Sequence, residues 1–163
     1  MILKVLSISS LVVIVDRLTK YLLLKNYSEG ESVSIIPCIF HITLVLNSGV
    51  AFGLFKGAGV IFTISSFLII VLIGAYVWRN ERKDFLTLLA LGLILGGAVG
   101  NFIDRAAFGY VIDFLDFRIW PVFNIADSSI TIGAFILALR LTLNKRCQFS
   151  FKRDATSARH PEP

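Results

Sequence analysis

The sequence predicts an all-α membrane protein with four transmembrane helices and a small β-sheet outside the membrane. Apolar residues make up 56% of the 163 residues and charged residues only 17%, whereas soluble domains average roughly 45–50% apolar and about 25% charged residues. The apolar residues also form four long blocks. Each block is close to the ~20 residues that a helix needs to cross a bilayer.

The four blocks place the predicted helices at residues 2–24, 60–78, 85–103 and 122–143. They form a single transmembrane domain over residues 1–144. We expect the first block to be retained as a helix, because no small-residue cleavage site of a signal peptide follows it. Residues 145–163 are expected to form a basic, disordered tail. A basic run can also bind nucleic acid, but here it follows an apolar helix, so we expect an anchor at the membrane surface and no nucleic-acid partner.

The distribution of Lys and Arg predicts the orientation of the helices. Lys4, the connector 79–83 and the segment 140–159 hold ten of the sixteen basic residues. With four spans, all three lie on one side of the membrane, which the excess of positive charge marks as cytoplasmic. Both termini are then cytoplasmic, and the loops 25–59 and 104–121 lie outside.

The first outer loop contains two short segments that are typical of β-strands. Residues 32–36 and 40–47 are rich in β-branched and aromatic side chains and are separated by Pro37. They predict a small sheet on the outer membrane surface. A glycine-bearing turn follows over residues 47–53.

Helix 85–103 contains glycines at four-residue spacing, at positions 92, 96 and 100. Such stripes of small residues let two helix backbones approach closely in lipid. Packing against a neighbouring helix of the same chain is sufficient to explain the stripe. A homodimer face is the alternative, and we expect a monomer.

Carboxylates gather at one predicted membrane face. Asp16 lies far along the first helix, Asp104 at the predicted end of the third, Asp113 in the following loop and Asp127 near the start of the fourth. Ionisable groups at membrane depth cost roughly 2.5–3.5 kcal/mol each on insertion scales, so each is a functional candidate. The topology brings all four to the outer face.

Some of these carboxylates have a basic residue nearby in sequence. The pairs are Asp16 with Lys20, Asp104 with Arg105, and Asp116 with Arg118. The i,i+4 spacing of Asp16 and Lys20 puts both on one helix face and favours an ion pair. These pairs are best explained as structural.

Asp113 and Asp127 have no adjacent basic partner, and they are the predicted catalytic dyad. Two close carboxylates cannot both ionise easily, so one keeps a proton. The ionised one can activate water while the other protonates the leaving amine, which is the chemistry of peptide hydrolysis. With two cysteines, two histidines and no GxSxG, the sequence favours neither a metal site nor a serine nucleophile, and we expect no cofactor.

At these residues the sequence resembles the lipoprotein signal peptidases (signal peptidase II), aspartic peptidases of the bacterial inner membrane. The resemblance extends to about Asn144 and rests on five blocks in order: Asp-Arg-Leu-Thr-Lys at 16–20, Asn-Ser-Gly-Val-Ala-Phe-Gly at 47–53, Gly-Gly-Ala-Val-Gly-Asn-Phe-Ile-Asp-Arg at 96–105, Gly-Tyr-Val-Ile-Asp-Phe at 109–114, and Phe-Asn-Ile-Ala-Asp at 123–127.

The resemblance implies a role for each matched residue. Asp113 and Asp127 match the catalytic aspartates. The positions that bind the substrate or support the dyad are Asn47, Gly49, Asn101, Arg105 and Asn124. Asp16, Lys20 and Asp104 match supporting positions. Asn124 can equally cap the fourth helix, and Arg105 can either neutralise Asp104 or bind a substrate carbonyl.

The resemblance also implies the reaction. The family removes the signal peptide from a prolipoprotein, cleaving before a cysteine that bears a diacylglyceryl group. The expected partners are therefore the lipid-modified precursor and membrane lipid, with the active site near the periplasmic face. Two other classes remain open from the residues alone: a proton-coupled transporter using the intramembrane carboxylates, and a membrane assembly factor using the glycine stripe.

Overall fold

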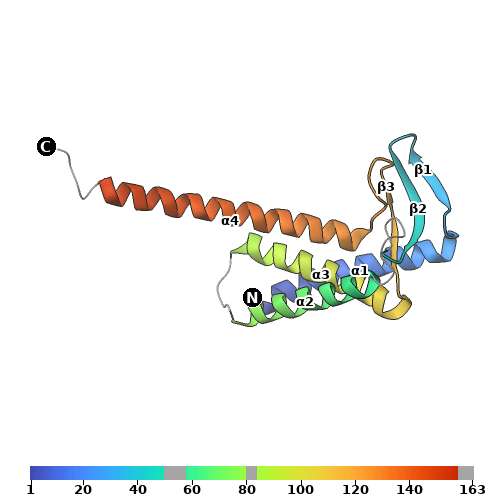
Figure 1. Ribbon diagram of the computed structural model, residues 1–163, viewed down its shortest axis with the longest axis horizontal. Helices are drawn as coiled ribbons and strands as arrows, with labels where there is room; N and C mark the ends of the chain where they lie inside the picture. The colour runs from blue at the N-terminus through green and yellow to red at the C-terminus, as the bar shows by residue number, and fades with distance from the viewer. Residues whose placement is uncertain (50–57, 80–83, 158–163) are drawn as a thin grey trace.

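The described part of the chain is mostly helical and contains one small antiparallel sheet, as the sequence predicts. The computed structural model describes residues 1–49, 58–79 and 84–157, with the backbone alone over 144–157. The elements in order are α1 (Ile2–Asn26), β1 (Ser32–Ile36), β2 (Phe40–Asn47), α2 (Ala58–Arg79), α3 (Phe85–Phe108), β3 (Val111–Asp116) and α4 (Ile125–Ser157). In Figure 1 the sheet lies at one end of the helices, and α4 extends beyond them at the other.

Helix α3 is the central helix, and its glycines allow the close packing. A Cβ atom at Gly96 would lie 2.7 Å from Cβ of Val12 in α1. A Cβ atom at Gly97 would meet the carbonyl oxygen of Ala126 in α4. The glycine stripe therefore packs α3 against two helices of the same chain, which confirms the intramolecular explanation.

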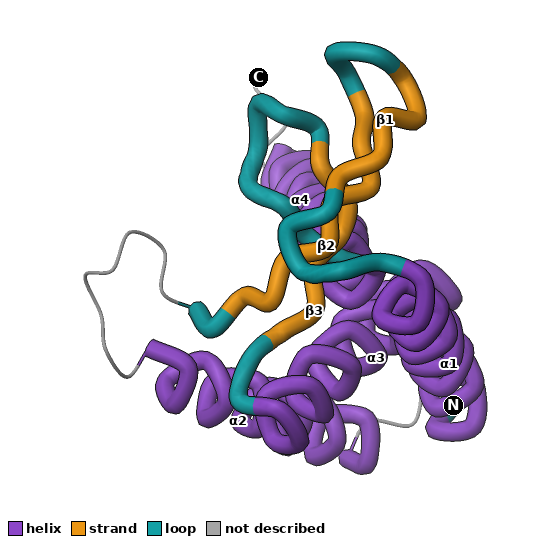
Figure 2. Tube along the Cα trace, turned by 90° about the vertical axis from the view of Figure 1, so that its right-hand side faces the viewer, coloured by secondary structure: helices purple, strands orange, loops and turns teal. Residues whose placement is uncertain are grey.

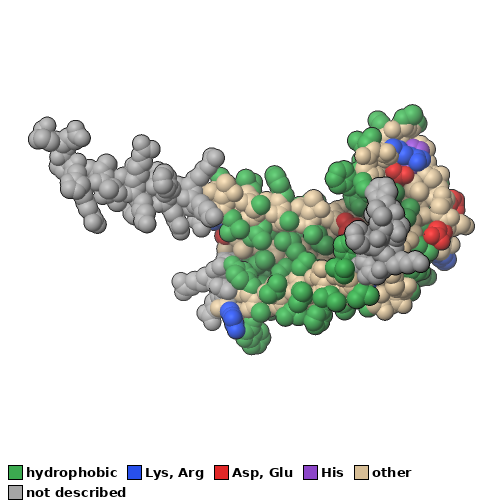
Figure 3. Space-filling view, viewed as in Figure 1, with side chains coloured by type: hydrophobic (Ala, Val, Ile, Leu, Met, Phe, Trp, Pro, Cys, Tyr) green, Lys and Arg blue, Asp and Glu red, His purple; other side chains and the backbone are tan. Residues whose placement is uncertain are grey.

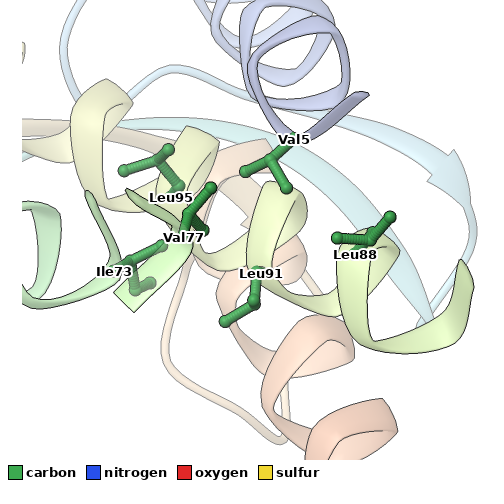
Figure 4. Packing of buried hydrophobic residues seen from close by; sticks show 6 residues of the cluster. All are labelled: Val5, Ile73, Val77, Leu88, Leu91 and Leu95. Atoms are coloured by element: carbon green, nitrogen blue, oxygen red, sulfur yellow. The ribbon is translucent and has the colours of Figure 1, made fainter. Parts of the chain in front are cut away.

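The apolar core lies among α1, α2 and α3 (Figure 4). Its buried members are Val5, Ile73, Val77, Leu88, Leu91 and Leu95. Many other large apolar side chains face outward over the helices instead of into this core, as Figure 3 shows for one face. In the part of the chain that the structure describes, three helices are long and apolar enough to cross a membrane, over Gly59–Arg79, Phe85–Phe108 and Ile125–Leu143. Helix α1 is not among them, because charged residues interrupt its apolar sequence.

The sheet has the strand order β1-β2-β3, and both pairs are antiparallel. Strands β1 and β2 have the bounds that the sequence predicts. Strand β3 is a correction, because the sequence analysis treats its residues as part of a loop. It pairs with β2 so that Asp113 lies opposite Val45, and Figure 2 shows the sheet crossing the ends of the helices.

Several helix boundaries also differ from the prediction. Helix α3 does not end at 103 but continues to Phe108, where Gly109 ends it in the left-handed conformation (φ 79°). Helix α4 starts at Ile125 and runs to Ser157, so residues 145–157, expected to be disordered, are helical. Residues 158–163, the connector 80–83 and positions 50–53 of the predicted turn lie outside the described residues.

Candidate active site

Asp113 lies on β3 with both carboxylate oxygens hydrogen-bonded. The Nδ2 of Asn124 donates to Oδ1 at 2.6 Å, and the Nδ2 of Asn47 donates to Oδ2 at 2.8 Å. The side chain is buried, at 2% exposure. Two amide donors on a buried carboxylate supply the partners that burial of a polar group requires.

Asn47 is oriented by the turn that begins at the end of β2. Its Oδ1 accepts a hydrogen bond from the backbone N–H of Gly49 at 2.9 Å, which leaves Nδ2 directed at Asp113. Gly49 has φ +78°, and a Cβ atom there would lie 3.0 Å from the ring of Phe62. Glycine suits this position because the left-handed conformation disfavours side chains. The predicted supporting pair of Asn47 and Gly49 therefore lies at the site.

Asp127 is held in the first turn of α4 by a reciprocal cap. The Oδ1 of Asn124 accepts from the N–H of Asp127 at 2.9 Å, and Oδ2 of Asp127 accepts from the N–H of Asn124 at 3.3 Å. This is the capping-box arrangement, built from an asparagine and the acidic residue three positions on. The Nδ2 of Asn101 donates to Oδ1 of Asp127 at 2.7 Å. The cap and the hydrogen bond from Asn101 thus hold one oxygen of this half-buried carboxylate toward α3.

A single residue, Asn124, connects the two carboxylates: its side chain donates to Asp113 and its backbone N–H donates to Asp127. Asn124 is 0% exposed and contacts Asp113 through its amide nitrogen and Asp127 through its backbone and its amide oxygen. Its Nδ2 also lies 3.2 Å from Oδ1 of Asn101. Asn124 therefore caps α4 and at the same time contacts Asp113 and Asp127.

Burial raises the pKa of Asp113 to about 7 from the ordinary value of 3.8. The hydrogen bond from Asn47 opposes this rise, and the negative charge of Asp127 adds to it. The carboxyl group of Asp113 is therefore divided between its protonated and ionised forms near neutral pH. A carboxyl group in this state can exchange a proton at the pH of the cell.

Arg105 lies beside the site and interacts electrostatically with Asp127, Asp113 and Asp104, although it forms no close ion pair with Asp104. Its guanidinium is 5.5 Å from the centre of the Phe62 ring, and Nη1 is 3.5 Å from Oγ of Ser66. These contacts with α2 leave its charge free to act on the two carboxylates. Phe62 and Ser66 are site neighbours that sequence reasoning missed, since nothing in α2 distinguishes them from other helix residues.

Asp16, Lys20 and Asp104 form a buried ion cluster next to the site. Nζ of Lys20 lies 2.9 Å from Oδ2 of Asp16, which confirms the predicted i,i+4 pair, and 2.6 Å from Oδ2 of Asp104. The remaining member is Arg17, whose Nη2 lies 2.9 Å from Asp16 and 2.7 Å from Asp104. The sequence gives Arg17 no predicted role, although it lies next to Asp16 and within the block at 16–20 that supports the family resemblance.

A groove of about 520 Å³ opens beside Asp127. It lies between α4 and the segment that follows β3, and its lining is almost entirely apolar: Phe117, Ile119, Trp120, Phe123, Ser128, Thr131 and Ile132. An apolar groove with one carboxylate at its edge is suited to an apolar ligand that reacts at that edge. Within the described residues, no three His, Cys, Asp or Glu side chains are grouped as a metal site.

Comparison with known proteins decides the family. The model of the family described as signal peptidase (SPase) II matches residues 8–143. The chain belongs to the signal peptidase II family. It is 45% identical over 131 residues to the lipoprotein signal peptidase of Halothermothrix orenii, covering 80% of this chain and 90% of that one. It is 40% identical over 141 residues to the lipoprotein signal peptidase of Bacillus subtilis strain 168, covering 84% and 92%.

Two solved structures of a bacterial membrane enzyme, obtained by the in meso method, share this fold. One, at 2.3 Å resolution, has a TM-score of 0.78 and 34% identity, with 86% of this chain and 88% of that chain covered. The other, at 1.9 Å, has a TM-score of 0.77 and 35% identity, with coverage of 84% and 91%. As a signal peptidase II, the chain is a protease of a bacterial membrane, and the predicted family is confirmed.

Proposed function

We propose that this signal peptidase II is an aspartic endopeptidase that removes signal peptides from lipid-modified prolipoproteins, with Asp113 and Asp127 as its catalytic dyad. The observation that supports the dyad most directly is the bridging of the two carboxylates by Asn124. Family membership supports the prolipoprotein substrate, since the relatives are lipoprotein signal peptidases. The cleaved bond is the one before the lipid-bearing cysteine.

The dyad supports hydrolysis without a metal or a covalent intermediate. The carboxylate that is ionised takes a proton from a water molecule as its oxygen attacks the scissile carbonyl carbon. The protonated carboxyl group stabilises the developing oxyanion by hydrogen bonding and then donates its proton to the leaving nitrogen as the C–N bond breaks. The raised pKa of Asp113, to about 7, is consistent with one shared proton at neutral pH.

The neighbouring polar residues have supporting roles in this proposal. Asn47, Asn101 and Asn124 orient the carboxylates through the hydrogen bonds described above. Gly49 keeps the Asn47 side chain in place. Arg105 presents a positive charge that can bind the substrate carbonyl.

The membrane arrangement is part of the same proposal. Residues 1–144 form one transmembrane domain, in which α1 crosses the membrane together with α2, α3 and α4. The buried charges of α1 face α3, while its leucines Leu3, Leu11 and Leu18 are exposed on the outside of the helix. Both termini are cytoplasmic, and the sheet and the dyad lie at the outer face. A monomer in contact with membrane lipid is expected, with the precursor approaching from the bilayer. The apolar groove beside Asp127 is compatible with such a substrate.

Cleavage by the purified protein tests the proposal. A precursor with a diacylglyceryl-cysteine is incubated with wild type, Asp113→Asn and Asp127→Asn, and the products are identified by mass spectrometry. We expect one cut before the modified cysteine with wild type and none with either variant. Asp116→Asn is the matched control, since Asp116 is a buried carboxylate on the same strand that pairs with Arg118 at 3.5 Å. Near-normal turnover by either dyad variant would refute the assignment.

A further inference from the structure

The ion cluster of Asp16, Arg17, Lys20 and Asp104 makes two contacts that charge neutralisation does not require. Oδ1 of Asp16 accepts from the backbone N–H of Ala126 at 3.1 Å. Oδ2 of Asp104 accepts from the backbone N–H of Ile112 at 3.3 Å. Ala126 and Ile112 are the residues immediately before Asp127 and Asp113. Each buried carboxylate of the cluster thus accepts from the backbone N–H of the residue that precedes one member of the dyad.

The contact from Asp16 completes the cap of α4. The first N–H groups of a helix have no partner within the helix. Asn124 satisfies the N–H of Asp127, and Asp16, which belongs to α1, satisfies that of Ala126. Gly100 allows this reach, since a Cβ atom there would lie 2.9 Å from Oδ2 of Asp16. The first turn of α4 is therefore fixed by two separate side chains.

Lys20 connects the two anchors. Its ammonium lies between the carboxylates of Asp16 and Asp104, at 2.9 Å and 2.6 Å, and its side chain is 2% exposed. The start of α4 and strand β3 are therefore linked through Lys20, and Arg17 bridges the same two carboxylates from a more exposed position. Buried ion pairs contribute little net stability, because desolvation offsets the attraction. A role in fixing geometry explains the cluster better than a role in stability.

We propose that Asp16, Lys20 and Asp104 are positioning residues that set the distance and angle between the two catalytic carboxylates by holding the amides of Ala126 and Ile112. The inference rests on the proposed function, because it assigns the dyad to Asp113 and Asp127. Misplacing a reacting group by about 1 Å lowers a rate on the order of 100-fold. Loss of either anchor therefore lowers kcat and leaves KM nearly unchanged.

Two matched double variants separate positioning from charge neutralisation. One double variant combines Asp16→Asn with Lys20→Met, and the other combines Asp16→Leu with Lys20→Met. Both remove the ion pair between residues 16 and 20 and keep Arg17 as the cation that neutralises Asp104. Only the first keeps an oxygen that can accept from Ala126. We expect the Leu variant to have a kcat about 10–100-fold below that of the Asn variant, with similar KM and an altered pH profile of kcat. Equal kcat values for two folded variants would overturn the proposal.

Amide hydrogen exchange on the wild-type protein gives a result even if a variant fails to fold. The N–H groups of Ala126 and Ile112 are expected to exchange slowly, as hydrogen-bonded amides do. Exchange of either at the rate of an unbonded amide would contradict the anchors, whatever the activity. If wild type cleaves no lipid-modified precursor while both amides are protected, the proposed function fails and the anchoring contacts remain.

Discussion

Removal of the Asn47 amide is predicted to move the pH dependence of cleavage toward higher pH. Asn47 donates a hydrogen bond of 2.8 Å to Oδ2 of Asp113. A donor to a carboxylate stabilises the ionised form, so this bond lowers the pKa of Asp113, against burial, which raises it to about 7. In Asn47→Ala the pKa of Asp113 therefore rises further. Activity that depends on the protonated form then persists to higher pH.

The size of the shift follows from the strength of the bond. A hydrogen bond to a charged group contributes about 1.5–3 kcal/mol, which corresponds to roughly 1–2 pKa units at 1.36 kcal/mol per unit. Asn47 is exposed, so water can replace part of the lost bond. We therefore expect the basic limb of the profile to move up by about one pH unit.

The assay is the pH profile of kcat/KM for a diacylglyceryl-cysteine precursor, which reports the groups of the free enzyme. Asn26→Ala is a suitable control, because Asn26 is also exposed and donates only to the Leu22 carbonyl at 2.7 Å. Its profile is expected to match that of wild type. A basic limb that stays in place or moves to lower pH in Asn47→Ala would refute the assignment of that limb to Asp113.

Three further predictions concern stability and the bridging asparagine. Gly96→Ala places a Cβ atom 2.7 Å from a side chain of α1 and should destabilise the fold by about 1–3 kcal/mol, whereas Gly74→Ala, with nothing within 4 Å, should be neutral or stabilising in thermal unfolding. Asp84→Ala removes the cap of α3 and should cost about 1 kcal/mol. The hydrogen bond from the hydroxyl of Thr87 helps lower the pKa of Asp84 to about 2. The stabilisation that the ionised cap gives to the fold is therefore present above pH 3.8 and is lost as pH falls through about 2. The free energies of unfolding of wild type and Asp84→Ala should become equal in acid. Asn124→Ser keeps a capping hydroxyl but loses the buried amide that donates to Asp113, so it should lower stability by about 1–3 kcal/mol and kcat by on the order of 100-fold; a near-wild-type kcat in the folded variant would contradict a role for the amide.

Features that depend on local sequence were predicted well. Strands β1 and β2 have the predicted bounds, because their β-branched residues lie between clear turn signals. The i,i+4 pair of Asp16 and Lys20 follows from helix geometry alone. The spacing of Asn124 and Asp127 likewise indicates a helix start.

Features that depend on partners distant in sequence were not predicted. Strand β3 contains two aspartates, a residue type that strands disfavour, and pairing with β2 is what makes it a strand. Asp104 pairs with Lys20, 84 positions earlier in the chain, instead of with its neighbour Arg105. The apolar pattern ends at Leu143, but α4 continues to Ser157, since a helix can continue through residues of good helix propensity such as Lys, Arg and Gln.

The pairing of Asp113 and Asp127 is the central claim, and comparison of the single and double amide variants tests it most directly. Cleavage of the lipid-modified precursor is measured for Asp113→Asn, Asp127→Asn and the double variant under single-turnover conditions. Residues that act as one unit have strongly non-additive effects. All three variants are therefore expected to fall to the same residual rate. A double variant whose loss is the product of two smaller single losses, or a single variant near the wild-type rate, would contradict a shared catalytic role.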